Sequence, residues 1–125
     1  MDARTREDEI RARLTDIAGP EPGRPERALL GRLIRNFLAK TPAGVEQLGE
    51  LLRGGTPGDV REHAHGLKGS AANLGADTLA AIFAEVERDA RDSIVPDPDL
   101  ILGRVGAELA QVQAVLEDLA GEWSQ

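Results

Sequence analysis

Apolar residues recur along this chain in alternating steps of three and four, the spacing that gathers them on one face of an α-helix. The pattern is most regular in the last third of the chain, where it takes in Leu102, Val105, Leu109, Val112, Leu116 and Leu119. No stretch alternates apolar and polar residues as a half-buried β-strand does. The sequence therefore predicts an all-α protein.

Glycine and proline residues divide this pattern into five predicted helices. Thr56 and Asp97 each precede a proline and are the expected N-terminal caps of the third and fifth helices. Gly75 and Gly121 are the expected C-terminal stops of the same two helices. We expect helices over about 4–18, 25–54, 57–74, 76–92 and 98–120.

Pro42 lies inside the second of these helices, where a proline either kinks the helix or ends it. Thr41 is a possible cap for a new helix at this point. The helical spacing of apolar residues nevertheless continues beyond the proline through Val45, Leu48, Leu51 and Leu52. We therefore favour one continuous helix over a broken one.

Short connections between helices favour antiparallel neighbours. The predicted fold is therefore an antiparallel up-down four-helix bundle over residues 25–121. An additional N-terminal helix and loop, residues 1–24, are expected to cap the bundle within a single domain.

Composition narrows the possible functions. The chain has 125 residues, about one domain, with a formal net charge of −7, which argues against nucleic acid as a partner. It has no cysteine, so disulfides and thiolate metal sites are excluded. No apolar run approaches the roughly 20 residues of a membrane span, and the charged N-terminus does not resemble a signal peptide. We expect a cytoplasmic protein that does not enter membranes.

One short stretch combines reactive and very small side chains on the third predicted helix. Its buried face is expected to carry Val60, Ala64, Leu67, Ala71 and Leu74, which turns His65 outward. Lys68 lies one turn further on, and Gly66, Gly69 and Ala72 surround the imidazole with small side chains. Two glycines inside a helix each cost about 1 kcal/mol relative to alanine. Close approach of another molecule is a physical reason to accept that cost.

This stretch resembles the signature of histidine-containing phosphotransfer (HPt) domains, commonly written H-x-x-K-G. The matching residues are His65-Gly66-Leu67-Lys68-Gly69-Ser70-Ala71, followed by Gly75. The apolar helices on either side are also similar to that family, so that the resemblance covers about residues 25–120. Gly66 departs from the pattern, because the family usually has a larger or hydroxylated residue there.

The resemblance implies a function for each matching residue. His65 would carry the phosphoryl group and Lys68 would stabilise it, while Gly69, with Gly66 and Ala72, would leave space for a docking protein. HPt domains take the phosphoryl group from an aspartate of one receiver domain and pass it to an aspartate of another. The expected partners are thus the receiver domains of hybrid histidine kinases and response regulators.

The chemistry of the residues agrees with a carrier that depends on its partner. A neutral imidazole is a nucleophile near pH 7 without a dedicated base. Phosphoryl transfer depends mostly on positioning and charge neutralisation. The sequence around His65 shows no nucleotide-binding loop, metal site or second acid–base group. We therefore expect a monomeric phosphorelay protein without kinase activity or a cofactor of its own, and the resemblance implies that the receiver supplies Mg²⁺.

Other interpretations stay open at this stage. A helical interaction module could bind receiver domains without carrying phosphate, although it would give His65 and Lys68 no function. The sequence His63-Ala64-His65 suggests a metal site, but residues two apart on a helix point about 200° away from each other. His63 is therefore expected at the boundary with a neighbouring helix.

Two further groups of residues are weaker candidates. Ser70 and Asn73 could donate hydrogen bonds to a phosphoryl group, but polar residues on helices more often meet water. The docking surface around His65 should be rimmed by residues of adjoining helices. The candidates for that rim are Asn36, Phe37 and Lys40.

Overall fold

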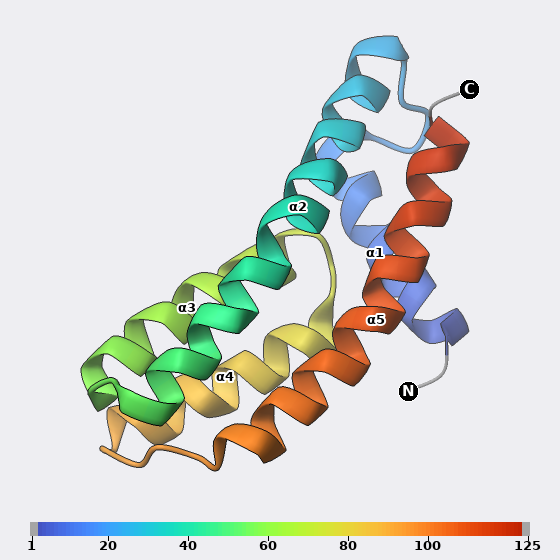
Figure 1. Cartoon of the computed structure of the whole chain (residues 1–125). Helices are drawn as coiled ribbons and strands as arrows, with labels where there is room; N and C mark the ends of the chain where they lie inside the picture. The colour runs from blue at the N-terminus through green and yellow to red at the C-terminus, as the bar shows by residue number, and fades with distance from the viewer. Residues whose placement is uncertain (1–2, 124–125) are drawn as a thin grey trace.

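The structure, a computed structural model, describes residues 3–123 and consists of five α-helices without a strand in that range. Their bounds are α1 Ala3–Ala18, α2 Arg24–Gly54, α3 Pro57–Asn73, α4 Asp77–Arg91 and α5 Pro98–Trp123 (Figure 1). The predicted fold class, a helical bundle with an additional N-terminal helix, is confirmed.

The two longest helices shape the molecule. α2 has 31 residues and α5 has 26, whereas α3 has 17 and α4 has 15. α3 and α4 pack together closely beside one half of the long pair, and the other halves of α2 and α5 project beyond them (Figure 1). α1 lies along this projecting part and contacts α2, α4 and α5. α3 packs against α2 and α4, and α5 packs against the same two helices, so α3 lies diagonally across the bundle from α5.

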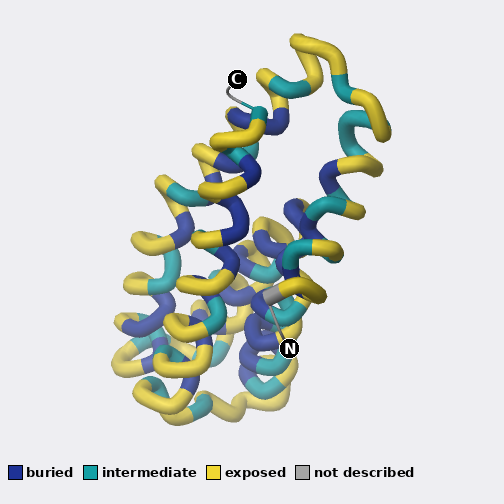
Figure 2. The backbone as a smooth tube through the Cα atoms, turned by 90° about the vertical axis from the view of Figure 1, so that its right-hand side faces the viewer, coloured by how far each residue is buried: buried dark blue, intermediate teal, exposed yellow. Residues whose placement is uncertain are grey.

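The core runs through the whole molecule, as Figure 2 shows by the buried positions that face inward along each helix. α1 contributes Ile10 and Leu14, with exposed fractions of 0% and 1%. The core of the four-helix part includes Ile34, Leu48, Val60, Ala64, Leu79, Phe83, Val86, Val105 and Leu116. Because Ile10 and Leu14 are buried in the same cluster, α1 is an integral part of the fold.

α2 is continuous through Pro42, as the apolar pattern favoured. Thr41 is buried and faces the bundle, whereas Pro42 is exposed. Leu48 and Leu52 continue the buried face beyond the proline. Their burial holds the helix together although Pro42 cannot donate a backbone hydrogen bond.

Both predicted N-terminal caps are confirmed. The Thr56 hydroxyl accepts a hydrogen bond from the Asp59 amide at 3.1 Å. The Asp97 carboxylate accepts hydrogen bonds from the amides of Asp99 at 2.9 Å and Leu100 at 3.2 Å. These bonds satisfy amides that the first turn of a helix leaves without partners.

One predicted C-terminal stop is confirmed and the other is wrong. Gly75 follows α3 with a φ of +78°, in the left-handed region that favours glycine. Gly121, however, lies inside α5, which continues to Trp123. Trp123 is half-buried and packs against the core, and this contact extends the helix past the glycine. Within residues 3–123, no helix has the length and apolar character to cross a membrane.

We expect Gly75→Ala to lower the free energy of unfolding by about 1–3 kcal/mol because of its left-handed backbone. A Cβ here would also lie 2.7 Å from both Arg13 Cβ and the Glu9 carbonyl oxygen. Gly106→Ala in α5 is the matched control, because a Cβ there meets nothing within 4 Å. This control should gain stability, by up to about 1 kcal/mol. Urea unfolding of both variants tests this; a Gly75→Ala protein as stable as the wild type would contradict it.

Candidate functional site

The site is built on the outward face of α3. The inward face of this helix carries Val60, Ala64, Leu67 and Ala71, all of which are buried. The same rotation turns His65 toward solvent, and 71% of its side chain is exposed. The imidazole therefore has the orientation that the apolar pattern indicates, and a second protein can reach it.

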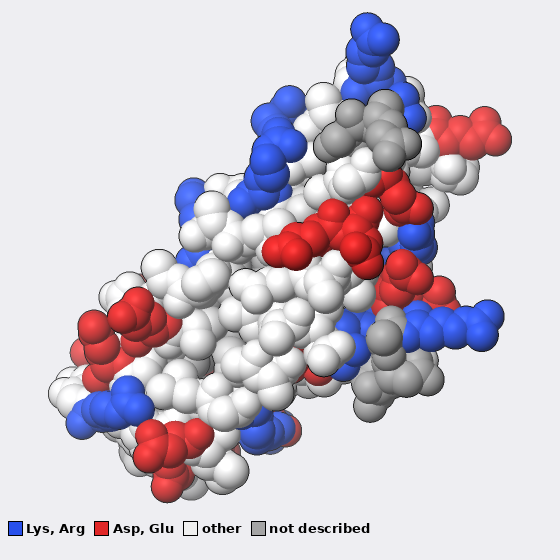
Figure 3. Space-filling view, turned by 45° about the vertical axis from the view of Figure 1, so that its right-hand side comes forward, with Lys and Arg blue, Asp and Glu red and all other residues white. Residues whose placement is uncertain are grey.

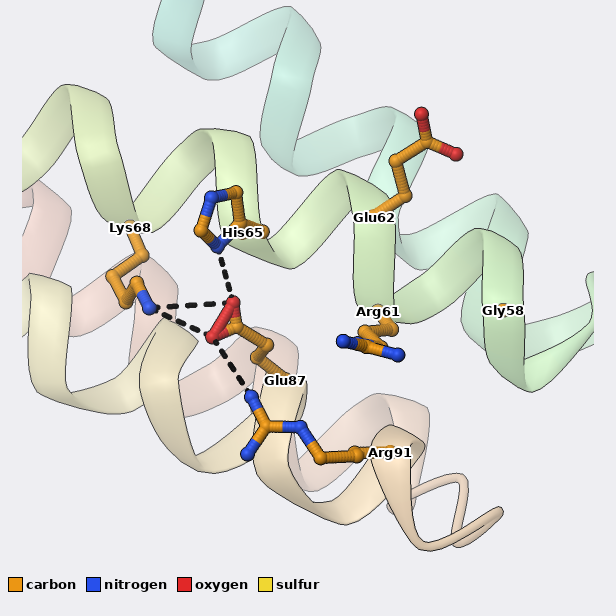
Figure 4. A pocket seen from close by; sticks show the side chains of 7 residues that line it. All are labelled: Gly58, Arg61, Glu62, His65, Lys68, Glu87 and Arg91. Atoms are coloured by element: carbon orange, nitrogen blue, oxygen red, sulfur yellow. Dashed lines mark hydrogen bonds and ion pairs between the residues drawn. The ribbon is translucent and has the colours of Figure 1, made fainter.

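A buried carboxylate from α4 holds the inner side of this imidazole. His65 Nδ1 lies 2.5 Å from Glu87 Oε2, and Lys68 Nζ lies 2.7 Å from Glu87 Oε1. Arg91 Nη2 is further away, at 3.8 Å from the same Oε1 atom. Only 7% of the Glu87 side chain is exposed. Figure 4 shows Glu87 between His65 and Lys68 on one side and Arg91 on the other.

The sequence-based expectation that no second acid–base group lies near His65 is therefore wrong. Glu87 is 22 positions away in the chain, and only the antiparallel packing of α4 on α3 brings it to the imidazole. A signal for it was present in the sequence. Glu87 directly follows Val86 and lies three residues before Ala90, so it occupies the buried face of its own helix. A charged residue on an apolar face is unusual unless it is paired.

The neighbours of Glu87 keep it ionised. The hydrogen bond from Lys68 lowers the pKa of Glu87 below its ordinary value of 4.5, and the hydrogen bond from His65 adds to this effect against the opposing effect of burial. A lowered folded-state pKa stabilises the fold fully above the ordinary pKa of the carboxyl group. This contribution is lost as the pH falls through the lowered value.

The ionised carboxylate determines which imidazole nitrogen is free. A carboxylate without a proton only accepts hydrogen bonds, so Nδ1 of neutral His65 carries the proton and donates it to Glu87. Nε2 then keeps its lone pair. In Figure 4 this second ring nitrogen is directed away from Glu87. The arrangement provides an exposed nucleophilic nitrogen together with a buried negative charge behind it.

The small residues beside His65 leave its surroundings open. A Cβ added at Gly66 or at Gly69 would meet nothing within 4 Å. Ala72, which follows on the same side of α3, is exposed. This part of the helix surface therefore offers backbone and methyl groups to an approaching molecule, instead of bulky side chains.

His65 also borders a hollow of about 510 Å³ between α3 and α4 (Figure 4). Two arginines, Arg61 from α3 and Arg91 from α4, line this hollow. The complete lining is Gly58, Arg61, Glu62, His65, Lys68, Glu87 and Arg91. Neither arginine was singled out from the sequence, because exposed arginines are common on helix surfaces.

The residues expected to rim the docking surface do not line this hollow. Asn36, Phe37 and Lys40 line a separate hollow of about 110 Å³ between α2 and α3, together with Ser70 and Asn73. Phe37 is only 5% exposed. None of the five lines the hollow that His65 borders, because that hollow lies between α3 and α4.

His63 lies at the interface between α3 and the neighbouring helix α2, as the sequence indicated. Its Nε2 atom is 2.7 Å from the carbonyl oxygen of Gly44 in α2, so the imidazole joins α3 to α2. Among the described residues, 3–123, no group of three or more His, Cys, Asp or Glu side chains is arranged to hold a metal ion.

The family model for the Hpt domain matches residues 32–121, which include α3, α4 and most of α2 and α5. The chain therefore belongs to the HPt family. Domains of this family are phosphotransfer modules of two-component systems and interact with receiver domains. Comparisons with curated proteins and with solved structures each gave no match.

We expect nuclear magnetic resonance to find the Nδ1–H tautomer of His65 near neutral pH. Long-range ¹H–¹⁵N spectra of histidine-labelled protein report which ring nitrogen carries the proton. Glu87→Ala should remove this preference, since Nδ1 loses its acceptor. Glu85→Ala is the matched control, because Glu85 is on the same helix but pairs with Arg104. A wild-type protein with the proton mainly on Nε2 would contradict the assignment.

Proposed function

We propose that this protein carries a phosphoryl group on Nε2 of His65 between the aspartates of two receiver domains in a multistep phosphorelay. The observation that carries the proposal is the pairing of an exposed imidazole with a buried, ionised carboxylate. Family membership supports it, because HPt domains are phosphocarriers rather than kinases.

In the proposed step, the lone pair of Nε2 attacks the phosphorus atom of the receiver's aspartyl phosphate. The N–P bond forms, the bond between phosphorus and the aspartyl oxygen breaks, and the aspartate leaves as a carboxylate. No proton has to leave Nε2, because the imidazole proton is already on Nδ1. The ring becomes positively charged as it loses its lone pair to phosphorus.

Glu87 is placed to stabilise that positive charge. Its carboxylate already accepts the Nδ1 proton, and it lies in a buried environment where charge interactions are stronger than in water. The same principle operates where a buried aspartate stabilises a catalytic imidazolium. Because the step is reversible, Glu87 also supports transfer of the phosphoryl group to the next receiver.

Lys68 supplies the opposite charge for the phosphoryl group. Its side chain is 32% exposed and extends from the helical turn after His65. In the unphosphorylated protein its ammonium is held by Glu87 at 2.7 Å. The flexible side chain of a lysine allows the ammonium to move toward a phosphoryl oxygen. We propose that Gly66, Gly69 and Ala72 admit the receiver and that the receiver brings the Mg²⁺.

We further propose that the protein acts as a monomer in the cytoplasm, since one carrier histidine suffices for each transfer. Its partners would be the receiver domains of hybrid histidine kinases and response regulators.

Labelling by a phosphorylated receiver or hybrid kinase tests the proposal. The wild-type protein should acquire an acid-labile, base-stable phosphate, and His65→Gln should acquire none. His63→Gln is the matched control and should keep the label, since the His63 imidazole bonds to the Gly44 carbonyl oxygen of α2 and does not line the hollow beside His65. Circular dichroism should show that both variants stay helical. A labelled His65→Gln protein would rule out the assignment, and a receiver that binds without labelling either protein would favour an interaction module.

Gly69→Gln should slow labelling by a receiver at least about tenfold, because small misplacements of reacting groups have effects of this size. Gly103→Gln is the matched control: this glycine is also helical, its Cβ position is also open, and it lies on α5. Both changes favour the helix, so that loss of folding would not explain a slower rate. Equal rates for the two variants would show that no partner approaches Gly69.

A further inference from the structure

Two arginines beside the site have no task in the proposed phosphoryl step. Arg61 precedes His65 by one helical turn on α3, and Arg91 follows Glu87 by one turn on α4. Both line the hollow that His65 borders. In Figure 4 both guanidinium groups lie on the Glu87 side of the imidazole, whereas the carboxylate of Glu62 is directed away from them. The free ring nitrogen also points away from this pair.

The charges of these arginines are largely uncompensated. Within residues 3–123, no carboxylate lies within 4.0 Å of the Arg61 guanidinium. Arg91 reaches Glu87 only at 3.8 Å and is 54% exposed. Glu87 is already bonded at closer range to Lys68 and His65. A local surplus of positive charge therefore lies next to His65 in a chain whose net charge is −7.

The size and position of the hollow point to a partner protein instead of the phosphoryl group. A volume of about 510 Å³ is larger than a phosphoryl group fills, and the hollow lies on the Nδ1 side of the ring. Gly58 forms part of its wall and leaves it open, since a Cβ there would come no closer than 3.8 Å to another atom. An anionic side chain from a docked protein can therefore enter it.

We propose that Arg61 and Arg91 form a seat for a carboxylate side chain on the docking face of the receiver. This inference rests on the proposed function, because it takes the docked protein to be a receiver domain. The surplus of positive charge at this open hollow is complementary to an anionic side chain on a docked protein, and such complementarity fixes the register of docking and the choice of partner. Arginine binds carboxylates through two parallel hydrogen bonds, which fix orientation as well as affinity. The seat thus helps to select which receivers dock in register with His65.

The test compares Arg61→Glu/Arg91→Glu with Arg24→Glu/Arg27→Glu. Each double variant replaces two positive charges by two negative ones, but the second pair lies at the start of α2, at the far end of the molecule (Figure 1). Figure 3 shows that charged side chains of both signs are scattered over the face it displays. The control therefore makes the same change in net charge at a different place on the surface. The probe is the phosphorylated receiver domain that labels the wild-type protein fastest in a screen of receivers from the same organism.

We expect kcat/KM for transfer from this receiver to fall about tenfold or more in Arg61→Glu/Arg91→Glu, since steering by local charge changes association rates by this order. The effect should lie mainly in KM and should shrink as salt is added, because salt screens exposed charges. Arg24→Glu/Arg27→Glu should transfer like the wild type. The milder Arg61→Gln/Arg91→Gln should show a smaller loss in the same direction, with helical content unchanged by circular dichroism.

Labelling by phosphoramidate, a small donor that needs no docking surface, separates this inference from the proposed function. The ratio of receiver-driven to phosphoramidate-driven labelling should fall in Arg61→Glu/Arg91→Glu. An unchanged ratio, or an equal fall in Arg24→Glu/Arg27→Glu, would overturn the carboxylate seat and leave the phosphocarrier function intact. Failure of both donors to label His65 in the wild-type protein would instead overturn the proposed function.

Discussion

The ionised carboxylate of Glu87 is the interaction on which the site depends. A charge that is removed from water is costly unless it is paired and hydrogen-bonded. Here Lys68 and His65, both on the facing helix α3, supply those bonds at 2.7 Å and 2.5 Å. The same contacts orient the imidazole and hold the ammonium beside it. One buried group therefore organises two side chains that would otherwise move independently on an exposed helix surface.

That pairing requires α3 and α4 to be in register, and the turn between them sets the register. Gly75 adopts a left-handed conformation, and the Ala76 amide donates to the Ala71 carbonyl at 3.0 Å. α1 packs directly on this turn: Arg13 Nε donates to the carbonyl oxygen of Asn73 at 3.0 Å. A bidentate ion pair between Arg6 and Glu108, at 2.7 and 2.9 Å, also ties α1 to α5. The N-terminal helix lies outside residues 32–121, yet it supports the turn that places Glu87 under His65.

The two sides of the imidazole face different surroundings. Nδ1 faces a buried carboxylate, and Nε2 faces a surface that Gly66 and Gly69 leave without side chains. The arginines of the adjacent hollow lie on the Nδ1 side. Charge that orients the carrier and its partner is thus separated from the space into which the phosphoryl group would enter.

Local sequence was sufficient for the helices and for the outward position of His65. Caps at Thr56 and Asp97, the left-handed Gly75 and the period of apolar residues act over a few positions, so that they can be recognised without a fold. The extension of α5 past Gly121 was missed because it depends on a packing contact of Trp123.

The partners of His65 were decided by tertiary structure. The spacing of residues on one helix placed Lys68 near His65, but Glu87, Arg91 and the hollow they line depend on how α4 packs against α3. For the same reason, the candidate docking residues on α2, which are Asn36, Phe37 and Lys40, line a different hollow from the one beside His65. A helical repeat determines which residues share a face, whereas the contact between two helices depends on the turn that joins them and on the core they bury together. That information is spread over the whole chain and is not contained in any one motif.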